Sequence, residues 1–167
     1  MKNKLFIIFF IFCFNSILLK AHSVETFNFD VTEIQVLENG NKFIGSKRGT
    51  ITSNDGILIK ADQFEYDKNL NILNAKGNVE ILDKINKYLI TTNDVTYEKE
   101  EEIIYTKGNS RASSSKDNII IYSEDFIYNR KKNIINAKKN VVIENQNKDY
   151  KIKSNFVDFF LDENRIF

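Results

Sequence analysis

The sequence predicts an all-β fold built from repeated units of about 31 residues, and three observations support this. Similar residues recur at a spacing of 31 between Ala61 and Phe167. Within each unit apolar residues alternate with polar ones, and short polar segments separate the alternating runs. Self-similarity at such a period is typical of stacked supersecondary units, and alternation with a period of two is typical of strands.

The repeat is clearest in four apolar registers, and the asparagines at 78, 109 and 140 mark a shared bend. The registers are Phe64, Val95, Phe126 and Val157; Tyr66, Tyr97, Tyr128 and Phe159; Ile72, Ile103 and Ile134; and Leu73, Ile104, Ile135 and Ile166.

Each unit reads as two antiparallel strands and two turns. The segment 73–81 alternates strictly, and so does the segment 57–61. The run 57–61 ends three residues before Phe64, which is an odd number. Its side chains and that of Phe64 would therefore lie on opposite faces of the sheet unless the strand has a bulge between them. We therefore expect a β-bulge or sharp bend at Asp62-Gln63 and its equivalents. Turn chemistry places the turns at 67–69 and 83–87.

The two ends of the repeat region deviate from the period. Val36, Ile44 and Gly49 match Phe64, Ile72 and Gly77 at a spacing of 28, which predicts a first unit shortened by three residues in its turn. Terminal repeats often deviate because they cap the stack. The last unit stops at Phe167, just after its return strand at 165–166 should begin.

The N-terminus has the features of a cleaved secretory leader. Lysines precede an apolar run at 5–19, and the small residues around His22 fit a signal peptidase site. We expect residues 1–23 to be a signal peptide and residues 24–167 to form one repeat domain. The mature chain then has neither Cys nor His, so disulfides, thiol catalysis and imidazole metal sites are excluded, and we expect no cofactor and no metal.

Charge argues against a nucleic-acid partner. Removal of the leader takes away three of the 24 basic residues and no acid, which leaves 21 basic against 23 acidic residues. Such a chain has no broad basic field. The cluster Arg130-Lys131-Lys132 is interpreted as a solvated turn, and the acidic run 98–102 as a solvated hairpin tip.

Carboxylates are the remaining candidates for catalysis. Asp94 and Asp125 occupy equivalent repeat positions, so stacking could bring them together as a glycosidase-like couple. Their counterparts in the other units are Gln63 and Phe156, which indicates a structural position. We therefore expect the protein not to be an enzyme.

Two segments resemble the OstA-like repeat, in which "A-D-x-(aromatic)-x-Y" is followed after a turn by "A-x-G-x-V-x-I". They are 61–67 with 73–81, and 123–128 with 136–143, where Lys139 replaces the glycine. The family comprises the lipopolysaccharide-transport proteins LptA, LptC and the N-terminal domain of LptD. The opening 25–31 and the segment 47–51 look most like that LptD domain. Members of that type continue into an outer-membrane barrel, so the chain is either a fragment truncated at its C-terminus or a free, LptA-like bridge module.

The resemblance implies a V-shaped, twisted β-jellyroll that binds the acyl chains of lipopolysaccharide in an apolar trough. An ordinary sandwich core would use the same inward residues, and the sequence leaves both arrangements open. The inward set is Phe64, Tyr66, Leu73, Val79, Ile81, Tyr88, Ile90, Val95, Tyr97, Ile104, Phe126, Tyr128, Ile135, Val141 and Ile143.

The resemblance further implies a periplasmic location, in association with the outer membrane, and partners among other OstA-like proteins. These would join by strand addition at open edges, with an outer-membrane barrel as a further candidate partner. The apolar segment 156–161 is expected to be such an edge, covered by a neighbouring repeat domain or a missing C-terminal region. The alternatives are a secreted β-solenoid or adhesin-like protein without lipid transport, and a carbohydrate-active domain that uses Asp94 and Asp125.

Overall fold

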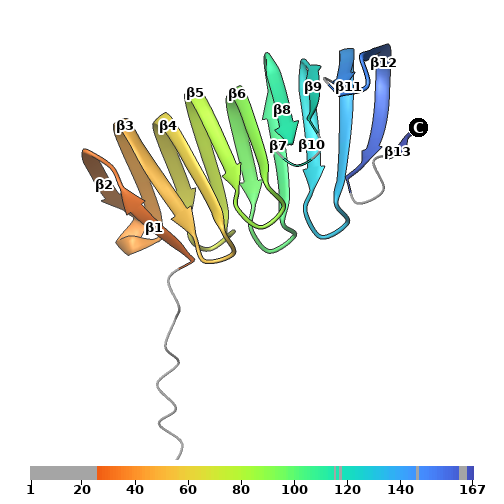
Figure 1. Ribbon diagram of the computed structural model, residues 1–167. Coiled ribbons are helices and arrows are strands. Elements are labelled where there is room, and N and C mark those ends of the chain that lie inside the picture. The colour runs from red at the N-terminus through yellow and green to blue at the C-terminus, as the bar shows by residue number, and fades with distance from the viewer. Residues whose placement is uncertain (1–25, 115, 117, 146, 162–164) are drawn as a thin grey trace, which may run out of the picture.

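The protein is all-β, and its strands follow one another in chain order from one end of the body to the other (Figure 1). The computed structural model describes residues 26–114, 116, 118–145, 147–161 and 165–167. The predicted signal peptide lies outside these residues. The elements are β1 (Phe27–Asp30), β2 (Glu33–Leu37), the 3-10 helix η2 (Glu38–Gly40), β3 (Lys42–Ser53), β4 (Ile57–Asp67), β5 (Ile72–Asp83), β6 (Tyr88–Glu98), β7 (Ile103–Lys107), β8 (Ser110–Ser114), β9 (Ile119–Ser123), β10 (Asp125–Asn129), β11 (Ile134–Asn145), β12 (Tyr150–Phe160) and β13 (Arg165–Ile166).

Each long strand takes part in two layers. The first half of β6 pairs with β8 and its second half pairs with β7, while β11 pairs in the same way with β10 and then β9. We call the layer that holds β2, β7, β10 and β13 the first layer, and the layer that holds β1, β8 and β9 the second layer. All pairing is antiparallel between neighbours, so the chain zigzags through both layers as it advances. The predicted units of two strands and two turns are confirmed.

The bends that separate the layers lie where the sequence predicts them. The register of β4 against β5 shifts between Lys60 and Gln63, opposite a shift between Lys76 and Val79. Gly77 has φ +76°, and a Cβ there would lie 2.7 Å from a carboxylate oxygen of Asp62. A left-handed residue with a close neighbour favours glycine, which explains the residue at this bend.

Aspartates close the turns. Oδ1 of Asp67 accepts hydrogen bonds from the backbone N–H groups of Asn69 and Leu70, and Oδ1 of Asp83 does the same for the turn that follows β5. Such side chains mimic the backbone partner that a turn otherwise lacks. Both predicted turns are confirmed.

The first unit is shortened by one residue, so the predicted spacing of 28 is wrong. Lys47, Gly77 and Gly108 are the equivalent left-handed residues of the bends, and the first two are 30 residues apart. The missing residue lies in the turn 54–56 between β3 and β4, which has three residues where the turn 84–87 has four. A match by residue type pairs Gly49 with Gly77, whereas the backbone conformation pairs Lys47 with Gly77. Lys47 has the left-handed conformation that favours glycine.

The segment 156–161 contributes three residues to the core, and this corrects its interpretation as an edge that a neighbouring repeat domain or a missing C-terminal region covers. Val157, Phe159 and Leu161 are buried, and only Phe156 is half exposed. The chain's own strand β13 pairs with Phe159 and Phe160, because residue 165 returns along β12 as the period requires. Among the described residues, the open edge of β12 is its first half, Tyr150–Ser154, whose side chains are largely exposed.

Within the described ranges there is no helix long and apolar enough to cross a membrane.

Candidate functional site

The fifteen residues predicted to line the trough all face the space between the two layers. None of them has more than 5% of its surface exposed, and Leu73, Tyr97, Ile104, Tyr128, Ile135 and Ile143 have 0%. They form one apolar cluster that runs through every unit. In this conformation the interior is closed, so an acyl chain could reach these side chains only if the layers moved apart.

Aromatic rings hold the layers together at the N-terminal end of the interior. Phe27, from the second layer, packs edge-on against Tyr66 of the first layer with ring centroids 4.9 Å apart, and against Tyr97 at 6.0 Å. Edge-to-face aromatic pairs add about 1 kcal/mol to the free energy of burial.

The side of the body opposite the bends carries a cluster of ionic and phenolic side chains that joins the two layers between Asp55 and Arg130, and we call it the rim cluster. It lies where the turns of the first layer meet the turns of the second. Its members are Asp55, Asp83, Tyr97, Lys99, Glu102, Tyr128 and Arg130.

Arg130 is the centre of this cluster. The Arg130 side chain is 3% exposed, although residue 130 lies in the turn that follows β10, on the rim of the first layer. Nε donates a hydrogen bond to Asp83 at 2.9 Å and Nη1 donates to the carboxylate of Asp55 at 2.5 Å, while Nη2 donates to the Asp55 backbone carbonyl at 3.0 Å. Both aspartates belong to the second layer, so one guanidinium links the two rims.

Other first-layer side chains reach the same two carboxylates. The Tyr97 hydroxyl donates to Asp55 at 2.5 Å, and Lys99 pairs with the same oxygen at 2.7 Å. The Tyr128 hydroxyl donates to Asp83 at 3.0 Å. Tyr97 and Tyr128 therefore place their rings in the apolar interior and their hydroxyls in the rim cluster.

The electrostatics of the cluster favour the ionised carboxylates. Burial opposes the charge of Asp55, but hydrogen bonds from Lys99, Ser53 and Tyr97 and the charge of Arg130 hold its pKa well below the ordinary value. The pKa of Asp83 is also lowered, because the hydrogen bonds from the Asn86 backbone and from Arg130 outweigh burial.

The two tyrosines respond in the opposite sense. Burial, followed by the neighbouring carboxylate, raises the pKa of Tyr97 and of Tyr128 far above the ordinary value. Both phenols are therefore neutral donors at any physiological pH.

Sequence reasoning missed this cluster, since Arg130 was interpreted as part of a solvated turn. A signal was present in the repeat: Lys68, Lys99 and Arg130 are 31 residues apart, and two of these cations contact the same carboxylate. The acceptor could not be found in this way, because Asp55 lies 75 residues from Arg130.

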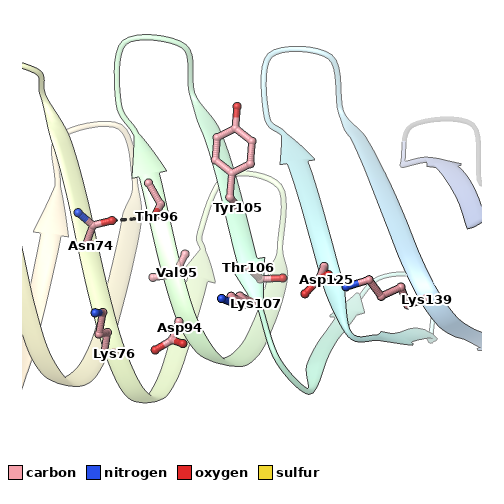
Figure 2. A pocket seen from close by; sticks show the side chains of 10 residues that line it. All are labelled: Asn74, Lys76, Asp94, Val95, Thr96, Tyr105, Thr106, Lys107, Asp125 and Lys139. Carbon is pink, nitrogen blue, oxygen red and sulfur yellow. Dashed lines mark hydrogen bonds and ion pairs between the residues drawn. The ribbon is translucent and has the colours of Figure 1, made fainter.

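The predicted carboxylate couple lies elsewhere, on the outer face of the first layer. Asp94 and Asp125 line a hollow of about 480 Å³, together with three lysines (Figure 2). In the register Asp94 is opposite both Lys76 and Lys107, and Asp125 pairs with Lys139 at 2.8 Å. Strand β7 separates the two aspartates, which places their backbones about 10 Å apart. The outer face thus carries a ladder of alternating charges, each acid facing a lysine.

The bends, the two layers and the apolar interior define a repeat-built β-jellyroll. No family model matches the chain, and no curated protein matches it. A solved structure does: the chain is similar to LptH from Pseudomonas aeruginosa, described as the LptA-homologous periplasmic component of the lipopolysaccharide transport device. The TM-score is 0.60 at 16% sequence identity, over 66% of this chain and 80% of that one. The similarity shows a shared fold and confirms the predicted fold class.

Proposed function

We propose that the protein is a non-enzymatic, periplasmic lipid-binding module of the OstA-like family, which carries lipopolysaccharide toward the outer membrane. One observation carries the proposal: an apolar interior continuous through every unit, inside a fold shared with a component of a lipopolysaccharide transport device. The motifs that resemble the OstA-like repeat also support it.

The physical chemistry of the interior suits acyl chains. Each methylene removed from water contributes about 0.8 kcal/mol, so even partial burial of each chain holds a lipid with several chains out of water. The phosphorylated sugar headgroup stays outside. Transport by such a module requires a continuous apolar path and an energy source elsewhere, and no chemical step.

The open edges suit partners of the same fold. Among the described residues β2 pairs only with β3, and the first half of β12 pairs only with β11. Such edges recruit strands, and we propose that other OstA-like proteins add to them in register, so that the apolar interiors join. An outer-membrane barrel is a further candidate partner. Whether the role is that of LptA or of the LptD N-terminal domain depends on which partner is bound. The proposed location requires a cleaved leader at residues 1–23.

Photo-crosslinking at two adjacent positions tests lipid binding. Ile90 faces the interior and is 1% exposed, whereas its neighbour Leu89 faces outward and is 38% exposed. A photoreactive aliphatic residue at Ile90 should capture lipopolysaccharide, and the same residue at Leu89 should not. Equal capture at both positions would indicate adsorption to the surface, and capture at neither would contradict the proposal.

The closed interior favours a second candidate function. Side chains packed to 5% exposure or less would also suit a secreted structural repeat protein, such as a β-solenoid or an adhesin-like rod. A rod with a permanently dry core gives no crosslink at Ile90, so the same experiment separates the two functions.

A further inference from the structure

We infer that the rim cluster is a latch: acyl chains enter the interior sideways, between the turn rims of the two layers, and the contacts of Arg130 must open for them to do so. This inference rests on the proposed function and names the route to its site.

The route follows from how the layers are connected. On the bend side most strands run without interruption from one layer into the other, as β4, β5 and β6 do, so the layers cannot part there. On the rim side, the described residues connect the two layers only through side chains, as in the contacts of Arg130 with Asp55 and Asp83. The layers can therefore move apart in one way, by hinging at the bends and separating at the rims.

The contacts on the rim side differ in kind from the rest of the interior. Acyl chains can replace apolar contacts between the layers without loss of the free energy of apolar burial, because one hydrocarbon surface is exchanged for another. They cannot replace the partners of Arg130, Asp55 and Asp83. A lipid that enters from the rim side must therefore displace these ion pairs, and the cluster decides when the interior is accessible.

The chemistry of the cluster also makes its opening feasible. Buried ion pairs recover hydration when they are exposed, and this largely offsets the loss of their mutual attraction. Arg130, Lys99 and Glu102 all lie at the turns of the first layer and would face water directly after separation. The cluster thus fixes the closed arrangement while leaving the free energy of opening small.

A covalent lock tests the latch directly. Cys13 is the one cysteine of the sequence and belongs to the predicted leader, so new cysteine pairs react selectively. Asp55→Cys with Lys99→Cys, joined by a short cleavable bismaleimide, would tie the rims where the two side chains now meet at 2.7 Å. The matched control is Asp125→Cys with Lys139→Cys on the outer face of the first layer, where the pair also meets at 2.8 Å.

The measurement is the association rate of purified lipopolysaccharide labelled on its sugar headgroup. We expect the rim lock to slow association at least tenfold, cleavage of the linker to restore it, and the outer-face lock to leave it unchanged. Equal rates for the locked and cleaved rim variants, with binding intact, would overturn the latch and leave the proposed function standing. Absence of binding by the unmodified protein would instead overturn the proposed function and the latch with it.

A charge-neutral variant, which lacks the ion pairs of the rim cluster, tests the converse of the covalent lock. Arg130→Met with Asp55→Asn, Asp83→Asn and Lys99→Met removes the ion pairs of the cluster and leaves Glu102, whose side chain is 34% exposed, as its remaining charge. We expect faster amide hydrogen exchange in the turns 54–56 and 99–102 than in the unmodified protein, unchanged exchange at the bends, and at least fivefold faster lipid association. Faster exchange at these turns with unchanged association would show that lipid does not enter between the rims.

Discussion

Replacement of Arg130 by methionine should be among the most destabilising single changes in the protein. Methionine keeps much of the volume of the side chain but leaves Asp83, whose side chain is 1% exposed, as a buried carboxylate without its cation. Removal of one partner from a buried ion pair costs about 3–5 kcal/mol. Domains of this size unfold with about 5–15 kcal/mol, so the loss is a large fraction of the total and should lower Tm by roughly 10–20 °C.

The matched control is Arg48→Met. Arg48 also bridges two carboxylates, those of Asp62 and Glu80, at 3.1 and 2.7 Å, but its side chain is 45% exposed. Exposed pairs contribute at most about 1 kcal/mol. The two arginines thus make similar ion pairs and differ chiefly in burial.

Urea denaturation followed by circular dichroism measures both free energies of unfolding. The second substitution Asp83→Asn, added to Arg130→Met, should recover part of the loss, because it removes the stranded charge. A loss below 1 kcal/mol for Arg130→Met, or equal losses for the two arginines, would refute the reasoning that the rim cluster is buried and couples the layers.

Three further changes have distinct expected outcomes. Phe159→Lys should prevent folding or lower Tm strongly because Phe159 is fully buried, whereas Phe156→Lys, at a half-exposed position, should leave circular dichroism unchanged. Gly49→Ala should destabilise by about 1–3 kcal/mol in urea denaturation, since its Cβ would lie 2.8 Å from a backbone oxygen of β1. Tyr97 and Tyr128 have raised pKa values in the folded state only, so their contribution to the stability of the fold is complete below about pH 10 and declines above it. Absorbance titration should show both phenols ionising only as the protein unfolds. Ionisation of either phenol before unfolding would contradict this.

The fold could be predicted from the sequence largely because, among the described residues, the strands of each unit pair only with strands of the same or an adjacent unit. Alternation around Leu73 and the odd step before Phe64 are local patterns, and local patterns decide the strands, turns and bends of a stacked repeat. The first unit was misaligned because Lys47 adopts a backbone conformation that residue type does not reveal. The sequence predicts the return strand at 165–166 but not that two residues of it are enough to cover Phe159, which pairs with Ile166.

The candidate site was predicted only in its apolar part. Alternation identifies which side chains face inward, and all fifteen do. It does not determine how far the layers are apart, because the same inward set suits an open trough and a closed core. The rim cluster was not predictable in this way, since the contact of Arg130 with Asp55 depends on how the twist of each layer offsets the two rims.

Each repeat unit is a hairpin whose strands bend from one layer into the other, and each unit lengthens the body by a fixed amount. Each unit of 31 residues adds two strands to both layers, which extends the body by about 10 Å along the stacking direction without changing its cross-section. Insertion or deletion of whole units would leave every bend, face and turn in phase. The length of such a body can therefore be set in steps of one unit, by the number of units alone.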